Sequence, residues 1–166
     1  MNDKKVDLEA AHGVRSRILN YSILIEMRLE DFIRDYFVDN NDKKLRFGEL
    51  VIHKEFFTFE QKIRVFEKII YELKDKKFDT LNGEYDLTNN KKELIKKIKH
   101  IREIRNATAH IHPFRNEGTN DIAIIYHFGG KSKEIILNDK FGMEIFKEYS
   151  EVDDILRSLS RELFER

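Results

Sequence analysis

The sequence Ile-Arg-Glu-Ile-Arg-Asn-Ala-Thr-Ala-His occupies residues 101–110 and combines an apolar helix face with a compact set of chemically active side chains. Three apolar residues recur at the i, i+4, i+7 spacing that lines one face of a helix: Leu94, Ile98 and Ile101. The pattern therefore predicts one helix over residues 91–111, with Asn89 or Asn90 able to cap its start.

Arg105 lies within the apolar stripe of this helix, at about 20° from Leu94 when each residue advances by about 100°. Its guanidinium is therefore expected to point into a helical bundle. A charge in a medium of low dielectric constant is costly unless it meets an anion or several acceptors. Two interpretations stay open, a buried ion pair with a carboxylate such as Glu26 and a binding site for an anionic ligand.

The residues around Arg105 favour the second interpretation. Asn106 follows directly, His110 comes five positions after the arginine, and Pro113 biases residue 112 out of the helix. This Arg-x4-His arrangement at a helix end resembles the signature of HEPN domains, whose Arg-x(4 to 6)-His motif marks metal-independent ribonucleases built as helical bundles. The resemblance covers the motif helix closely and the rest of the first ~115 residues in helix pattern only.

The resemblance implies a role for each motif residue. Arg105 would bind phosphate and stabilise the transition state, Asn106 would orient an oxygen, and His110 would act as general base or acid. These residue types suit the chemistry, because a guanidinium binds phosphate bidentately and an imidazole transfers protons near neutral pH. The implied function is a metal-independent endoribonuclease of a toxin–antitoxin or phage-defence system, cleaving RNA through attack by the 2′-hydroxyl.

Helix geometry adds a constraint on the pair Arg105 and His110. Residues five apart on a straight helix point about 140° from each other, so they cannot both face one phosphate. Either the helix bends or ends before His110, or two copies of the motif meet in a symmetric dimer. HEPN ribonucleases generally take the second route, so the resemblance implies a homodimer.

His112 departs from one form of control within the family that the motif resembles. In HEPN toxins silenced by nucleotide attachment to a tyrosine, that tyrosine stands two residues after the motif histidine, where this chain has His112. An antitoxin or nucleotidyltransferase partner is implied by the resemblance, but this departure puts the tyrosine-based form in doubt. His112 and Glu26 are candidate auxiliary residues of the site, and each is also explained as an ordinary polar residue.

Two other classes of function remain open. The first is a non-catalytic HEPN-like module that binds RNA, a nucleotide or a protein partner as a dimeric regulator. The second is a structural helical dimer in which Arg105 pairs with an acid such as Glu26. The genes beside this one would discriminate between them, because an antitoxin or nucleotidyltransferase neighbour favours the ribonuclease and a metabolic operon favours the regulator.

Basic residues are concentrated in residues 91–111, which contain seven Lys and Arg residues but only two acidic residues. Such a helix face is often only solvated, but it can also contact the phosphate backbone of RNA without reading sequence. The candidate RNA-binding residues are Lys92, Lys96, Lys97, Lys99 and Arg102.

Composition bounds the class of protein. The 166 residues suit one domain over residues 1–166, and the 31 basic and 31 acidic residues cancel. The chain has no cysteine, and its six histidines form no i, i+4 pair, so neither a metal nor a cofactor is predicted. The polar start lacks a signal-peptide core and no apolar run approaches about 20 residues, so a cytoplasmic protein without membrane contact is expected.

The first half of the chain is predicted to be helical. One long helix is expected over residues 6–37, with a break near His12 and Gly13 as an alternative. A short helix is expected over residues 47–55, and Thr58 is expected to cap a third helix. The turn-forming residues within 75–90 predict a loop rather than a strand.

The last third changes its period. Alternating apolar residues on both sides of a Gly-Gly-Lys-Ser turn at 129–132 predict a β-hairpin over about 121–138. That turn lacks the first glycine of a phosphate loop. A final helix over about 139–165 is expected, capped by Asn138 or Asp139. The predicted fold is mainly α, an up-and-down helical bundle of HEPN type with a small β-hairpin inserted before the last helix.

Overall fold

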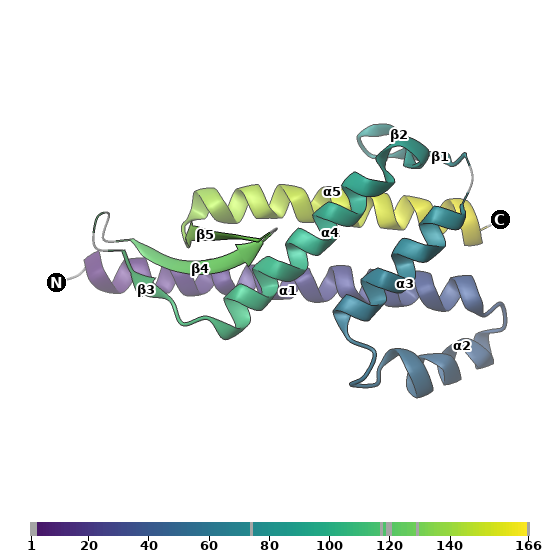
Figure 1. The fold of residues 1–166 in the computed structure, drawn as a ribbon, viewed down its shortest axis with the longest axis horizontal. Helices are drawn as coiled ribbons and strands as arrows, with labels where there is room; N and C mark the ends of the chain where they lie inside the picture. Colours follow the sequence, from purple (N-terminus) through teal and green to yellow (C-terminus); the bar gives the residue numbers. More distant parts are fainter. Residues whose placement is uncertain (1–2, 74, 117, 119–120, 129, 166) are drawn as a thin grey trace. The chain divides into compact units, whose positions relative to one another are not determined.

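Helices make up most of the chain, and the mainly α class is confirmed (Figure 1). The computed structural model describes residues 3–73, 75–116, 118, 121–128 and 130–165. Its helical elements are α1 (Asp3–Phe37), α2 (Asn41–Phe47), η1 (Gly48–Ile52, a π-helical segment), α3 (Phe59–Glu72), α4 (Leu87–His110) and α5 (Asp139–Phe164). Its strands are β1 (Lys77–Thr80), β2 (Gly83–Asp86), β3 (Phe114–Arg115), β4 (Ile122–Phe128) and β5 (Lys131–Ile136).

The internal contacts of the chain divide it into two compact units. Unit 1 comprises Met1–Ile23 and His100–Tyr149, and unit 2 comprises Leu24–Lys99 and Ser150–Arg166. Each of the helices α1, α4 and α5 therefore contributes residues to both units. The interpretation of the chain as one domain stays a prediction.

The core of unit 2 is built on aromatic contacts of Phe32 in α1. Its ring lies 5.0 Å from that of Phe66 in α3 and 5.3 Å from that of Phe164 in α5, both in edge-to-face geometry. Four residues on the predicted apolar face of α3 are buried: Phe59, Ile63, Phe66 and Ile70. These phenylalanines are core residues, as the helical spacing indicates.

Thr58 caps α3 as predicted. The backbone N–H of Gln61 donates to Thr58 Oγ1 at 3.4 Å, and the backbone N–H of Thr58 donates to Gln61 Oε1 at 2.8 Å. These reciprocal bonds form a capping box, which satisfies donors that have no partner within the helix.

The predicted helix over 47–55 is wrong in its bounds. The chain instead forms α2 and the π-helical segment η1, so helical structure begins six residues earlier and ends at Ile52. The reason is a helix cap before residue 47, because the side chain of Asn40 accepts a hydrogen bond from Lys43 N at 3.1 Å.

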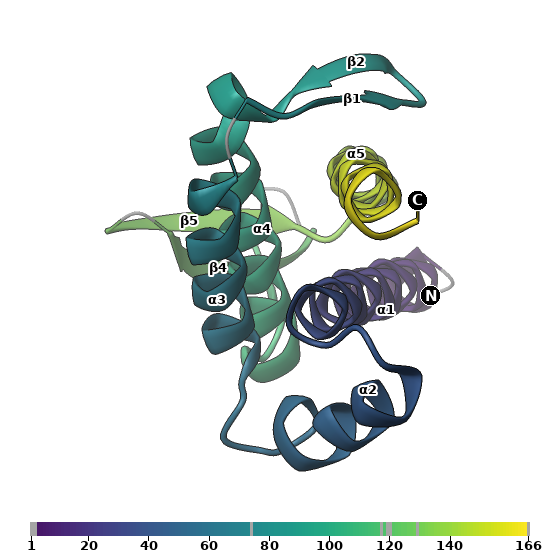
Figure 2. The same ribbon diagram turned by 90° about the vertical axis from the view of Figure 1, so that its right-hand side faces the viewer.

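The predicted loop over 75–90 is also wrong, because it contains an antiparallel hairpin, β1 and β2 (Figure 2). The pair Thr80 and Gly83 closes a two-residue turn, and Gly83 has a φ of 109° that favours glycine. The backbone N–H of Leu81 donates to the buried carboxylate of Asp154 in α5 at 2.9 Å. Asn82 before Gly83 is a typical hairpin signal, and the contact with Asp154 is tertiary.

Helix α4 starts at Leu87, which lies before both predicted caps. The capping acceptor is Asp86 at the end of β2, whose carboxylate accepts from Asn89 N at 3.2 Å. This backbone hydrogen bond is the main cause that holds the pKa of Asp86 below its ordinary value. The start of the motif helix is therefore set by the hairpin.

In unit 1 the N-terminal part of α1 continues through His12 and Gly13 without a break. A Cβ added to Gly13 would meet nothing within 4 Å, so no close packing requires glycine there. The alternative of a broken first helix is wrong. One buried stripe follows this part of α1: Ala11, Val14, Ile18 and Ser22.

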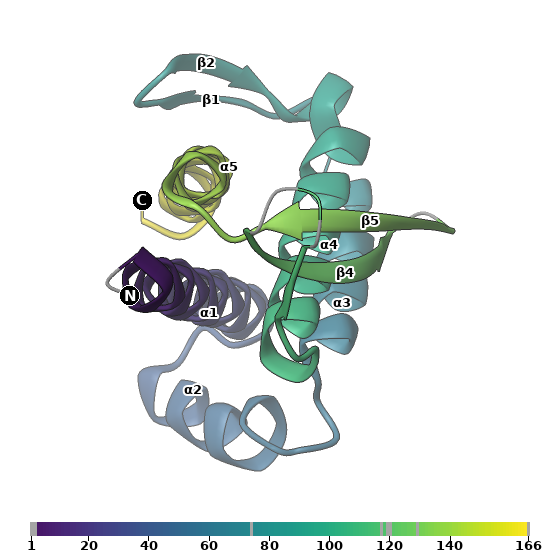
Figure 3. The same cartoon turned by 90° about the vertical axis from the view of Figure 1, so that its left-hand side faces the viewer.

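The hairpin predicted over about 121–138 is confirmed as β4 and β5, and the sheet lies beside the second half of α4 (Figure 3). A third strand, β3, was not predicted, because its two residues carry no detectable alternation. Gly129 of the predicted Gly-Gly-Lys-Ser turn lies outside the described residues, and Gly130 has a φ of 75°.

The final helix is confirmed as α5, and Asn138 is its cap, since its side chain accepts from Phe141 N at 2.9 Å. In unit 1 this helix is fixed to α1 by a buried pair, with Ser22 Oγ and Tyr149 Oη 2.7 Å apart. Burial raises the pKa of Tyr149 strongly, so this phenol is neutral at physiological pH.

Removal of the capping box should destabilise unit 2. For Thr58→Ala we expect the free energy of unfolding to fall by about 1 kcal/mol, because the backbone N–H of Gln61 loses its acceptor. Urea unfolding followed by circular dichroism measures this change. The matched control is Thr88→Ala, since Thr88 is exposed and its hydroxyl makes no hydrogen bond within the described residues. Equal stabilities of the two variants would contradict a capping role for Thr58.

Candidate functional site

Arg105 keeps the angular position within the apolar face of α4 that its spacing predicts, but its side chain is not fully buried. Ile101 and Ile104 are fully buried, whereas Arg105 is only part-buried. The guanidinium is therefore accessible to a ligand in the isolated chain.

The partner of Arg105 is an amide. Its Nη1 donates to Asn106 Oδ1 at 3.2 Å, and no carboxylate of the described residues pairs with it. Glu26, the predicted candidate partner, instead accepts from Lys62 Nζ at 2.7 Å in unit 2. A guanidinium has five N–H donors, so most of those on Arg105 remain available for an anion.

Helix α4 includes His110 as its last residue. The backbone N–H of Ile111 still donates to Ala107 O at 2.9 Å, so the helical hydrogen bonding persists to this point. The alternative of a helix that ends before His110 is wrong. Arg105 and His110 therefore point about 140° apart within one chain. The side chains of His110 and His112 are both exposed.

Thr108 within the motif has a structural role. It is buried, and its hydroxyl donates to Ile104 O at 2.8 Å and Arg105 O at 3.0 Å. This bonding satisfies the hydroxyl inside its own helix. Thr108 is thus occupied by the backbone and is not available to a ligand.

Arg15 in α1 is a residue of this region that the sequence analysis missed. Its Nη2 donates to the backbone carbonyl of Ala109 at 3.2 Å, one residue before His110. The helical spacing places Arg15 next to the buried stripe, four residues after Ala11 and three before Ile18. That spacing was visible in the sequence, but the carbonyl it reaches was not.

Two of the predicted RNA-binding lysines are held by acids in unit 2. Lys97 Nζ contacts Glu151 at 2.5 Å and Glu93 at 3.1 Å, while Lys99 Nζ contacts Glu67 at 2.9 Å. Burial lowers the pKa of Lys97, but the hydrogen bonds that its ammonium donates to Glu151 and Glu93 outweigh this effect and raise the pKa. The ammonium charge of each lysine is therefore partly neutralised by its neighbours.

The other predicted RNA-binding residues differ in their surroundings. Lys92 and Lys96 are exposed, and neither has an ion-pair partner in the described part of the chain. Arg102, in unit 1, pairs with its neighbour Glu103. The positive charge that is free to meet phosphate is therefore smaller than the sequence count suggests.

A second polar network of unit 1 centres on His100, which the sequence analysis did not single out. His100 Nδ1 lies 3.0 Å from Glu148 Oε2 in α5, and its Nε2 lies 3.2 Å from Tyr126 Oη in β4. Burial, followed by the charge of Glu148, raises the pKa of Tyr126. This network links α4 to β4 and to α5, so the role of His100 is structural.

His127 lies on the exposed side of β4. Its Nδ1 is 3.0 Å from Ser132 Oγ on the paired strand. In the residues that the structure describes, no group of three or more His, Asp and Glu side chains is arranged to hold a metal ion. No described helix combines the length and apolarity needed to cross a bilayer.

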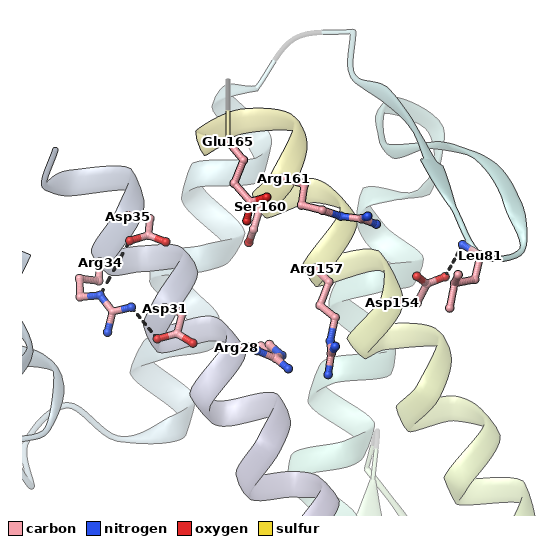
Figure 4. Close-up of a pocket in the computed structure, with 10 residues that line it drawn as sticks. All are labelled: Arg28, Asp31, Arg34, Asp35, Leu81, Asp154, Arg157, Ser160, Arg161 and Glu165. Carbon is pink, nitrogen blue, oxygen red and sulfur yellow. Dashed lines mark hydrogen bonds and ion pairs between the residues drawn. The ribbon is translucent and has the colours of Figure 1, made fainter. Parts of the chain in front are cut away.

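A cavity of about 530 Å³ lies in unit 2 and contains none of the motif residues (Figure 4). Four arginines and four acids line it, so their formal charges cancel. Arg28 pairs with Asp153 at 2.8 Å and Arg34 with Asp31 at 2.7 Å. Since the charges of the lining cancel, this cavity is a poorer anion site than the surroundings of Arg105.

Comparison of the chain with protein-family models, curated proteins and solved structures finds no match. The resemblance to HEPN domains therefore rests on the motif at the end of α4.

The contacts of Lys62 predict a specific loss of stability. Its Nζ contacts Glu26 at 2.7 Å and Glu30 at 2.5 Å, with only 6% of its side chain exposed. Lys62→Met should lower the free energy of unfolding at pH 7 by about 3 kcal/mol, because two carboxylates would lose their shared cation. The exposed Lys68 on the same helix supplies the control, and Lys68→Met should stay within about 0.5 kcal/mol of the parent.

The pH dependence gives the same test a second readout. Burial lowers the pKa of Lys62, but hydrogen bonds and charges from Glu26 and Glu30 raise it overall. A raised pKa in the folded state contributes stability that is complete below the unfolded value and is lost as pH rises through the folded value. Urea unfolding above about pH 10 should therefore show a smaller alkaline loss in Lys62→Met than in the parent. Identical losses would show that Lys62 makes no such contribution.

Proposed function

We propose that the chain is a metal-independent endoribonuclease whose site includes Arg105, Asn106 and His110. The observation that carries the proposal is the state of Arg105, which is part-buried, oriented by Asn106, and without a carboxylate partner in the described part of the chain. A guanidinium held in this way is suited to bind a phosphate, because its charge and most of its donors are uncommitted.

The proposed reaction needs a phosphate-binding group and a group that moves protons. The 2′-hydroxyl oxygen of the substrate attacks the adjacent phosphorus, its proton passes to a base, and the bond from phosphorus to the 5′-oxygen breaks. The leaving oxygen takes a proton, so the products are a 2′,3′-cyclic phosphate and a 5′-hydroxyl. His110 is the proton-transferring residue, and Arg105 stabilises the additional negative charge on the phosphate.

The angle between Arg105 and His110 supports a site made by two chains. With α4 helical through His110, the two side chains cannot meet one phosphate from the same straight helix. A symmetric dimer would instead combine Arg105 of one protomer with His110 of its partner. This arrangement agrees with the homodimer that the resemblance to HEPN ribonucleases implies. We propose that the dimer acts in a cytoplasmic toxin–antitoxin or phage-defence system.

A non-catalytic RNA-, nucleotide- or protein-binding module is the second candidate. The observation in its favour is the same separation of Arg105 and His110, because a single chain then offers an anion site without a proton-transfer group beside it. Binding of RNA without cleavage by a pure protein would make this the better conclusion.

His110→Ala should lower RNA cleavage by about 10²–10⁴-fold, the usual contribution of a general acid or base. The fold should be retained, since His110 is exposed. The assay is cleavage of single-stranded RNA in EDTA, with analysis of the product ends. His127→Ala is the matched control, because His127 is also exposed but contacts Ser132.

Three results would contradict this mechanism: loss of parent activity in EDTA, products with a 5′-phosphate, or equal rates for His110→Ala and the parent. Arg105→Ala should also be inactive. Asn106→Ala should be weakened rather than inactive, because it removes the amide that orients the guanidinium.

Mixing two inactive variants should restore activity if the site is shared between chains. In a mixed dimer of Arg105→Ala and His110→Ala, one site would hold an intact arginine from one chain and an intact histidine from the other. Random pairing makes about half of the dimers mixed, so recovery to about a quarter of parent activity is expected. Each variant alone is the control. No recovery after subunit exchange, verified by co-purification of the two variants through different affinity tags, would argue for a site within one chain.

A further inference from the structure

Arg15 approaches the end of the motif helix from α1, within unit 1. Its Nη2 donates to Ala109 O at 3.2 Å, and that oxygen belongs to the peptide bond that enters His110. The side chain is part-buried, and it has no carboxylate partner in the residues that the structure describes. The arginine is thus held beside the proton-transferring residue with its charge uncompensated.

The contact between Arg15 and Ala109 caps the end of α4, but capping alone does not explain why the residue is an arginine. The last four carbonyls of a helix have no partner within it, and Arg15 satisfies one of them. A neutral donor would do the same. The guanidinium uses one of its five N–H groups in this bond, which leaves a fork that matches a phosphate.

The neighbouring arginine provides a contrast. Arg17 in α1 pairs with Asp139 at 3.0 Å, and its side chain is 52% exposed. Its charge is therefore matched by an acid in the same unit. Arg15 differs because its contact is a backbone carbonyl, so the positive charge stays available.

We propose that Arg15 is a second phosphate-binding residue, which contacts the phosphate next to the one that is cleaved. Ala109 lies one helical turn after Arg105, on the same side of α4 and roughly 6 Å along its axis. Arg105 and the carbonyl that Arg15 contacts therefore lie on one side of the helix, and neither guanidinium has a carboxylate partner in the described residues. This inference rests on the proposed function and specifies its substrate class: an RNA strand with at least two consecutive phosphates.

The test measures RNA binding in a His110→Ala background, so that the strand is not cleaved. Affinity for a single-stranded oligonucleotide is measured by fluorescence anisotropy between 50 and 200 mM salt. The slope of log affinity against log salt reports the phosphates that are neutralised, at about 0.7 per phosphate on a single strand. Adding Arg15→Gln should reduce the magnitude of this slope by about 0.7, and Arg17→Gln should leave it unchanged.

The length of the ligand provides a second comparison. With a dinucleoside monophosphate, which has a single phosphate, Arg15→Gln should change neither the affinity nor the slope. A helix-capping role alone would weaken both ligands equally. Arg15→Lys is the conservative variant, and it should restore the salt slope because it retains the charge. It also serves as the folded comparison if Arg15→Gln does not fold.

The outcomes separate this inference from the proposed function. One outcome would overturn the inference. Arg105→Gln reduces the salt slope, but folded Arg15→Gln or Arg15→Lys loses affinity equally for the oligonucleotide and for the dinucleoside monophosphate. Arg15 then acts only as a helix cap. The proposed function then stands. If the folded His110→Ala protein binds no single-stranded RNA at any salt concentration tested, the proposed function itself is wrong.

Discussion

The buried face of α4 is the constraint on which the candidate site depends. Ile98, Ile101 and Ile104 are all fully buried, so the helix cannot rotate without exposing them. Exposure of even one such side chain would cost about 1.5–3 kcal/mol. Because the rotation is fixed in this way, Arg105 stays beside this face, and its guanidinium donates to Asn106. Core packing therefore sets the position of the charge.

The end of α4 is stabilised by bonds that do not involve the exposed histidines. The hydroxyl of Thr108 donates to a backbone carbonyl of its own helix, and Arg15 donates to the carbonyl of Ala109. Helix ends fray when their last carbonyls lack partners. With these partners the helix continues to His110, and the imidazole is presented from an ordered backbone. The same order keeps His110 away from Arg105, which is why a second chain enters the proposed mechanism.

The basic character of α4 is reduced by acids from distant parts of the sequence. Lys97 and Lys99 contact Glu151 and Glu67, which lie in α5 and α3. Charge counted along one helix overestimates the field that a ligand meets, because tertiary contacts bring compensating carboxylates close. The cations without a carboxylate partner in the described residues, such as Arg105, Arg15, Lys92 and Lys96, are better candidates for phosphate contact than Lys97 and Lys99.

The sequence alone determined the mainly α class, the capping box at Thr58, and the hairpin followed by a C-terminal helix, because these follow from local periodicity and capping. Only the tertiary structure showed that Glu26 pairs with Lys62, that 75–90 forms a hairpin, and that Arg15 reaches the end of α4. The physical reason is the sequence separation of the contacts. Periodicity and caps depend on residues a few positions apart, whereas these contacts join residues far apart in the chain, and no local pattern encodes the distance between such residues.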